Sequence, residues 1–457
     1  MTKYKIIGSY STTNKSVEKS TDDCTITIPL KSSAGTLNYG LDHLIQKFKD
    51  NAIFPSEDGI DLLCLAILTY LADTQISREM HSQDSWTREI IITIPVYHLS
   101  KWNAAAATIQ RMLNYLTGDI WNVMFVQKTD EIAPIPTLLT PPATFDAITL
   151  FSGGMDSLIE AINLLEKGKR IAFISHASDA YTKNSQRKLL AHFQEQYPEN
   201  KPTYLDLWTI FDTNLIEDGG GENSTRSRSF LFIAFGICAL SGISTASKLH
   251  VPENALIALN VPLDSLRIGS HSTRTTHPFY LDCWNLLLSI LDMQLTIFNP
   301  YWNKTKGEMA DECLNKDFLL HVIGDSISCS SPQKLRYKGA SPQHCGYCVP
   351  CIIRRAAISK AFGILNDPTP YYYNSITTLR ANHSLAEGVQ LRSFEIAANR
   401  LSGAPQIAKT LIQKSGPLNE NAEYQNELAS AYSRGLAEVS TFVYQAIQAE
   451  RQSHGES

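Results

Sequence analysis

The fold is decided by residues 147–157, which read Ala-Ile-Thr-Leu-Phe-Ser-Gly-Gly-Met-Asp-Ser. The first five residues form the largely apolar run of a buried strand, and the next six are mostly the small and polar residues of a tight turn. After the turn, apolar residues recur at helical spacing over 158–165. The stretch therefore predicts a strand, a glycine-rich turn and an amphipathic helix.

The turn has the composition of a phosphate-binding loop. Glycine amides can approach a phosphate closely because no Cβ intervenes, and the start of the following helix favours negative charge. Serine hydroxyls add donors, and the Asp156 carboxylate can hold a magnesium ion that bridges phosphate oxygens. The Walker pattern, with its Gly-Lys-[Ser/Thr] ending, is missing. We predict that ATP and Mg²⁺ are bound by Ser152, Gly153, Gly154, Met155, Asp156 and Ser157.

Strand and helix patterns alternate on the C-terminal side of this loop. The strands are expected at 170–174, 203–207 and 255–259, and the helices at 185–197 and 230–243. Continuously apolar strands that alternate with helices are typical of a parallel sheet covered on both faces. The predicted fold class is therefore α/β, with a doubly wound parallel sheet.

Three regions are expected along the chain. Residues 1–142 mix strand and helix patterns and are predicted to form an α+β accessory domain, which ends in a Pro-rich linker at 134–142. Residues 143–362 form the core domain that contains the loop. Residues 363–457 are rich in alanine and predicted to be a helical extension.

Composition narrows the class of protein. A chain of 457 residues with a formal net charge of −5 has no general attraction to nucleic acid or to anionic lipid. Its first residues lack the apolar run of a signal peptide, and no stretch of about 18 apolar residues occurs. We expect a cytoplasmic protein that does not enter the membrane.

Four of the nine cysteines are clustered in sequence. Cys329, Cys345, Cys348 and Cys351 follow the spacing C-x15-C-x2-C-x2-C, which can close a tetrahedral thiolate shell around a structural Zn²⁺ ion. Redox chemistry by the C-x2-C pairs and chance burial are the alternatives. The other five cysteines are predicted to be buried apolar residues.

The loop followed by the cysteine cluster resembles the 7-cyano-7-deazaguanine synthase (QueC-like) family of PP-loop ATP pyrophosphatases. The resemblance covers residues 145–362. Local matches are Ser185-Gln186-Arg187 to the family's Gly-Gln-Arg turn, Arg226–Phe230 to its Arg-Asn-x-x-Phe element, Thr305–Met309 to its Thr-Lys-x-Glu helix start, and Cys345–Cys351 to its cysteine knuckle.

The resemblance implies a PP-loop fold of the adenine nucleotide alpha hydrolase-like type. It also implies an activity, in which ATP adenylates the carboxylate of 7-carboxy-7-deazaguanine and ammonia or another amine displaces AMP. Asp156, Lys306 and Arg226 are then the expected catalytic residues, with Lys306 neutralising the leaving pyrophosphate.

The substrate segment departs from the family pattern. Ser227 replaces the family's asparagine, and residues 270–278 stand where the family carries Tyr-Pro-Asp-Cys-Arg. We predict that Arg267 and Arg274, in this Ser/Thr/His-rich region, bind phosphate or the substrate carboxylate, with a solvated salt bridge as the alternative. The sequence leaves open whether the acceptor is ammonia or a protein amine and whether the nitrile-forming step occurs.

The two terminal regions are absent from the ordinary biosynthetic enzyme. With them, the chain is similar to the QueC-like components of bacterial anti-phage (Qat-type) operons, which implies other proteins of such an operon as partners. Two further functions remain open from the sequence: a tRNA-modifying PP-loop enzyme, and a non-catalytic nucleotide-binding component of a defence complex.

Overall fold

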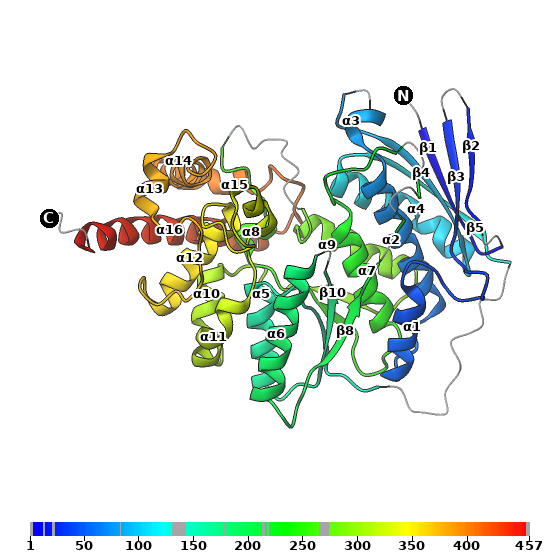
Figure 1. The fold of residues 1–457 in the computed structure, drawn as a ribbon, viewed down its shortest axis with the longest axis horizontal. Coiled ribbons are helices and arrows are strands. Elements are labelled where there is room, and N and C mark those ends of the chain that lie inside the picture. Colours follow the sequence, from blue (N-terminus) through cyan, green and yellow to red (C-terminus); the bar gives the residue numbers. More distant parts are fainter. Residues whose placement is uncertain are drawn as a thin grey trace.

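The computed structural model describes residues 3–11, 14–20, 23–82, 84–129, 143–177, 179–209, 211–212, 215–216, 219–264 and 274–453. Two five-stranded sheets organise this part of the chain. The first sheet lies at one end of the molecule, the C-terminal helices lie at the other end, and the second sheet lies between them (Figure 1). The predicted linker at 134–142 and the predicted substrate residue Arg267 fall outside the described residues.

The first sheet has the strand order β2-β3-β1-β4-β5, and only the β2–β3 pair is antiparallel. Its strands are β1 (Lys3–Ser9), β2 (Ser16–Lys19), β3 (Asp23–Pro29), β4 (Glu89–Val96) and β5 (Ile120–Gln127). The helices between them are α1 (Leu41–Asp50), α2 (Glu57–Gln75), α3 (Arg78–His81) and α4 (Leu99–Thr117).

The α+β prediction for this region is wrong, because the sheet is mostly parallel and is connected by helices. Strands β1, β3 and β4 bury every second side chain, since only one face of the sheet packs on helices within the described residues. Alternate burial is more typical of antiparallel sheets with one face in water, and mixed strand and helix patterns in the sequence do not show whether strands pair parallel or antiparallel.

The second sheet has the strand order β10-β9-β6-β7-β8, and every neighbouring pair is parallel. The predicted α/β class with a parallel sheet is therefore confirmed. The elements are β6 (Ala147–Leu150), α5 (Met155–Glu166), β7 (Ile171–His176), α6 (Ala180–Gln196), β8 (Thr203–Leu207), α7 (Arg228–Leu240), β9 (Lys248–His250), α9 (Pro278–Ile290) and β10 (Thr296–Phe298).

Helices cover both faces of this sheet. Ile148 and Ile174 belong to the hydrophobic cluster that contains α7 and α9, whereas Ala147 and Phe173 belong to the cluster that contains α5 and α6. Because alternate residues of a strand point to opposite faces, the two pairs of helices lie on opposite sides of the sheet. Strands β6 and β7 accordingly bury every side chain.

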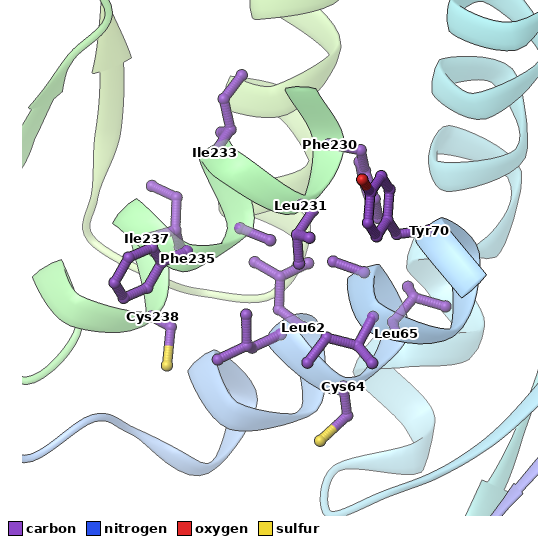
Figure 2. Packing of buried hydrophobic residues seen from close by; sticks show 14 of the residues in the cluster. Leu62, Cys64, Leu65, Tyr70, Phe230, Leu231, Ile233, Phe235, Ile237 and Cys238 are labelled. Carbon is purple, nitrogen blue, oxygen red and sulfur yellow. The ribbon is translucent and has the colours of Figure 1, made fainter. Parts of the chain in front are cut away.

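The two sheets share one hydrophobic core. Helix α2, which packs under the first sheet, lies against α7, which packs under the second. Figure 2 shows this contact, where Leu62 and Leu65 of α2 meet Leu231 of α7. The N-terminal region is thus packed onto the core domain through a continuous apolar layer.

The strand predicted at 255–259 is a helix, α8 (Ala255–Ala258), and the strand of this part of the sheet is the shorter β9. The side chain of Asn254 accepts a hydrogen bond from the Ile257 amide and so caps α8. A five-residue apolar run does not separate a buried strand from a buried helix by periodicity, and the capping asparagine is the signal that distinguishes them.

The predicted C-terminal extension is helical in the described residues. Helices α12 to α16 and α8 enclose a separate hydrophobic cluster, and α12 also contributes to the core beneath α5. The bounds are α10 (Lys306–Asp311), α11 (Lys316–Val322), α12 (Val349–Phe362), α13 (Ile376–Ala381), α14 (Val389–Gly403), α15 (Ala408–Leu411) and α16 (Ala422–Ser453), with 3₁₀ turns at Ile323–Asp325, Pro332–Lys338 and Pro405–Ile407.

Within the described residues, every helix is too short or too polar to cross a lipid bilayer.

Candidate functional site

The loop at Ser152–Ser157 lies where the second sheet reverses its strand order. β6 is the first strand of this sheet in the chain, and it is flanked by β7 on one side and by β9 on the other. Ligands of open α/β sheets bind outside the carboxyl ends of the strands at such a switch point. The segments that leave β6 and β9 there are Phe151–Ser157 and Val251–Asn254.

The loop turns at Gly153 and starts helix α5 at Gly154. Gly153 has φ +81°, and a Cβ on it would lie 3.1 Å from Cγ of Gln186. The amide of Gly154 donates to Oγ of Ser152 at 3.2 Å, and Oγ of Ser157 donates to the Gly154 carbonyl at 3.0 Å. The hydroxyls of both serines therefore lie on the loop itself, beside the first amides of α5.

Residues behind the loop hold it in place. Nε2 of Gln186 donates to the Ser152 carbonyl at 3.1 Å, and the amide of Ile327 donates to the Gly153 carbonyl at 2.8 Å. Oγ of Ser185 donates to the Asp325 carbonyl at 2.6 Å. The Ser185-Gln186 pair, noted in the sequence for its match to a family turn, thus supports the loop.

Asp156 is a buried carboxylate on the first turn of α5, 5% exposed. Its Oδ2 accepts hydrogen bonds from the backbone amide of Asn254 at 3.1 Å and from Nδ2 of Asn254 at 2.8 Å. Its Oδ1 lies 2.9 Å from Nζ of Lys306. The Lys306 ammonium is not oriented for a hydrogen bond to Oδ1. This buried oxygen therefore has no hydrogen-bond partner among the described residues.

Three polar neighbours keep Asp156 ionised. Burial alone would raise the pKa of Asp156, but the Lys306 ammonium, the Glu253 carboxyl and the Asn254 amide hold it below its ordinary value. Burial and the Asp156 charge raise the pKa of Glu253 well above its ordinary value. The surroundings therefore favour the ionised form of Asp156 and the protonated form of Glu253.

Lys306 is the first residue of helix α10 and is only 6% exposed. Thr305 caps this helix: its Oγ1 accepts from the Glu308 amide at 3.0 Å, and the Glu308 carboxylate accepts from the Thr305 amide at 2.9 Å. This capping box fixes the helix start. The structure thus brings together Asp156 and Lys306, two of the three predicted catalytic residues, although they are 150 positions apart in the sequence.

The third predicted catalytic residue, Arg226, contacts the N-terminal region instead. Its Nη1 donates to the Thr117 carbonyl at 2.6 Å, and its guanidinium lies 4.8 Å from the ring centre of Trp86. No hydrogen bond or ion pair joins it to Ser152–Ser157 among the described contacts. Burial, with the charge of Arg78, lowers its pKa to about 10.

Arg274, predicted to bind substrate, borders a cavity of about 870 Å³. Its Nη1 donates to the Tyr115 carbonyl at 2.9 Å, and its guanidinium lies over the Tyr115 ring. Lys334, Lys338 and Lys414 also line the cavity, and none of its described lining residues is acidic. Leu256 and Ile257 of α8 form another wall, one turn after the Asn254 that holds Asp156.

The four clustered cysteines converge into one candidate metal centre. The sulfurs of Cys329, Cys345, Cys348 and Cys351 all lie within 4.8 Å of one another, and two of the separations are 3.9 Å. A tetrahedral shell with bonds of about 2.3 Å to zinc places its sulfurs about 3.8 Å apart. The arrangement could hold a metal ion such as zinc.

Backbone geometry shapes this centre. Gly346 has φ +88°, and a Cβ on it would lie 2.2 Å from the Tyr373 carbonyl oxygen, so only glycine fits. The amide of Cys348 donates to Sγ of Cys345 at 3.3 Å. Cys329 lies two residues after Ile327, whose amide holds the Gly153 carbonyl, so the metal centre and the loop share a connecting segment.

The sequence pattern missed Glu253 and Asn254 as site residues. They precede α8, whose residues were predicted to be a strand. In that prediction Glu253 and Asn254 lie before the amino end of the strand, whereas ligands bind at the carboxyl ends of parallel strands. Asn254 also caps α8, so the pattern of a capping asparagine before an apolar run could have indicated it. No signal in the sequence indicated that Glu253 lies close enough to Asp156 for each to shift the pKa of the other.

No protein-family model matches the sequence, and a search of curated proteins finds no matching protein.

Replacing Gly153 with alanine should destabilise the protein by about 1–2 kcal/mol, because a residue with a Cβ is strained at positive φ. If the loop binds ATP, as the sequence predicts, this variant should also bind ATP more weakly, because the added methyl group pushes against Gln186 and shifts the loop. Gly168→Ala is the matched control: Gly168 has φ +68° with no atom near its Cβ position. Equal ATP affinity in the two variants would argue against the loop as the nucleotide site.

Proposed function

We propose that this chain is a PP-loop enzyme that cleaves ATP to AMP and pyrophosphate while adenylating a carboxylate, with 7-carboxy-7-deazaguanine or a related molecule as the substrate. The observation that carries the proposal is the ion pair of Lys306 with Asp156 on the first turn of the helix after the glycine loop. A phosphate loop, a buried acid and a buried cation meet there at the switch point of a parallel sheet.

The residues fit the nucleotide in distinct ways. The amides at the start of α5 and the hydroxyls of Ser152 and Ser157 suit phosphate oxygens. Asp156 has one buried oxygen without a hydrogen bond, which suits a magnesium ion; when bound, Mg²⁺ would neutralise charge on the departing pyrophosphate. Lys306 supplies a second positive charge at the same point.

The proposed reaction has two steps. An oxygen of the substrate carboxylate attacks the α-phosphorus of ATP, the bond from that phosphorus to the bridging oxygen of the β-phosphate breaks, and pyrophosphate leaves. An amine nitrogen then attacks the carbonyl carbon of the acyl adenylate, loses a proton, and displaces AMP. The first step is needed because a carboxylate is a poor electrophile until its oxygen becomes a good leaving group.

The 870 Å³ cavity is the proposed substrate site. It begins at α8, two residues after the Asn254 that binds Asp156. Lys338 of its lining is paired with Glu387, and the positive charges of Lys334, Lys414 and Arg274 suit a carboxylate substrate. Its size and partly apolar walls suit a planar heterocycle. Arg274 is then a wall residue of this site, in keeping with its predicted role.

A tRNA-thiolating enzyme is a weaker fit, since it would need a reactive cysteine pair outside a metal centre. Burial raises the pKa of Cys64 and of Cys313 to about 11. Cys64 of α2 and Cys238 of α7 are completely buried in the hydrophobic core. These thiols have the properties of inert core residues.

Isotope exchange between pyrophosphate and ATP tests the adenylation step. With 7-carboxy-7-deazaguanine present, labelled pyrophosphate should enter ATP, and omission of the carboxylate should abolish the exchange. Proteins from the same kind of defence operon, the proposed partners, should then be tested as amine donors by mass spectrometry. If no carboxylate and no partner supports exchange, the proposed reaction is wrong, and a non-catalytic nucleotide-binding role becomes the better account.

A further inference from the structure

The long C-terminal helix α16 reaches the helix start that carries Lys306. Oε1 of Glu438 accepts from Nζ of Lys360 at 2.6 Å and forms a short hydrogen bond with Oγ1 of Thr305. Oε2 of Glu438 accepts from the amide of Gly307 at 3.3 Å. The carboxylate therefore binds the residues on both sides of Lys306.

Arg434, one helical turn before Glu438 on α16, also binds the start of α10. Nε of Arg434 donates to Oε1 of Glu308 at 2.6 Å, and its Nη2 donates to Oε2 of Glu308 at 3.2 Å and to the Asn303 carbonyl at 2.8 Å. Glu308 is the acidic member of the capping box with Thr305. Arg434 thus binds Glu308 of the capping box, and Glu438 binds Thr305 of the same box.

The position next to Lys306 leaves room for this contact only because it is glycine. A Cβ on Gly307 would lie 2.7 Å from Oε2 of Glu438 and 2.8 Å from Cδ of Lys360. The Glu438 side chain is 12% exposed, so its charge is largely shielded from solvent and its contacts are specific. An ordinary surface salt bridge would not require such close packing.

We propose that Glu438 is a positioning residue for Lys306, so that the C-terminal helix is part of the machinery that cleaves ATP. This inference rests on the proposed function and adds to it the role of the helix. Glu438 fixes the backbone on either side of Lys306, and the fixed backbone sets the ammonium 2.9 Å from Asp156. Small displacements of a charge that acts on a leaving group cost large factors in rate.

The structure offers a matched control on the same helix. Glu450 accepts hydrogen bonds from Oγ of Ser375 and from the amides of Ile376 and Thr377, at 2.7 to 2.9 Å. It therefore clamps the start of α13 as Glu438 clamps the start of α10, but it does not contact the segment that carries Lys306. Glu450→Ala reports what the loss of such a clamp does to stability alone.

The test compares Glu438→Ala, Glu438→Gln and Glu450→Ala with the wild-type protein in pyrophosphate–ATP exchange. Glu438→Ala should lower kcat about 10- to 100-fold with little change in the KM for ATP, and the isosteric Glu438→Gln should recover part of the loss. Glu450→Ala should keep kcat. Thermal unfolding of all three variants identifies any loss that comes from misfolding.

A second readout does not depend on turnover. Acetylation of Lys306 by limiting acetic anhydride, measured by mass spectrometry, should increase in Glu438→Ala and in Gly307→Ala, which displaces the Glu438 carboxylate without removing it. Glu450→Ala should label as the wild type does. Equal kcat and equal Lys306 labelling in Glu438→Ala and wild type would overturn the positioning role, whereas an inactive wild-type protein would instead count against the proposed function.

Discussion

Replacing Asp156 with asparagine is expected to lower the rate of AMP formation from ATP about 1,000-fold without unfolding the protein. The rate falls because the variant loses the buried negative oxygen that suits magnesium and pairs with Lys306. The fold survives because Glu253 can take over the ion pair: part of the rise in its pKa comes from the Asp156 charge, and that cause disappears in the variant. Rates and thermal unfolding are measured on the same preparation.

Asp146→Asn is the matched control for this variant. Asp146 lies just before the start of β6, the strand whose other end leads into the Ser152–Ser157 loop. It accepts a hydrogen bond from the Arg170 amide at 2.8 Å. This control should cleave ATP at the wild-type rate.

A double variant, Asp156→Asn with Glu253→Gln, leaves the buried Lys306 without a carboxylate and should lose about 3–5 kcal/mol of stability. Wild-type rates in Asp156→Asn would refute its assigned role.

The second large effect is expected at the cysteine centre. Purified protein should contain one zinc ion per chain, and Cys348→Ser should lose it, together with about 4 kcal/mol or more of folding stability. The loss is large because the centre ties Cys329, near the loop, to the start of helix α12. Elemental analysis and urea unfolding measure the two effects.

Cys313→Ser provides the comparison, because Cys313 is buried but lies outside the cluster. It should keep the zinc ion. Wild-type protein that contains no metal and forms a reversible disulfide within the cluster would favour the redox alternative over a structural zinc site.

Local patterns predicted the elements that depend on a few neighbouring residues. The strand, turn and helix around Gly153 are governed by glycine conformation and by apolar periodicity, and both are visible in the sequence. The four cysteines were found by spacing alone, since short loops between ligands constrain their positions. For Asp156 and Lys306, each residue was predicted separately, and the fold brings them together.

Long-range packing determined what the sequence did not predict. Arg226 was assigned by its motif, but the packing of the N-terminal region on the second sheet places its guanidinium 4.8 Å from the ring centre of Trp86. The contact of Glu438 with Thr305 joins residues 133 positions apart. No local pattern encodes such a contact, because it depends on how α16 lies across α10.

The most direct test of the central claim is the identity of the nucleotide product. Purified protein, Mg²⁺, α-labelled ATP and 7-carboxy-7-deazaguanine are incubated, and the labelled products are separated. Cleavage at the α-phosphorus by the Ser152–Ser157 site predicts labelled AMP, with pyrophosphate released in equal amount. Labelled ADP, or unchanged ATP in the presence of every carboxylate and partner tested, would contradict the account.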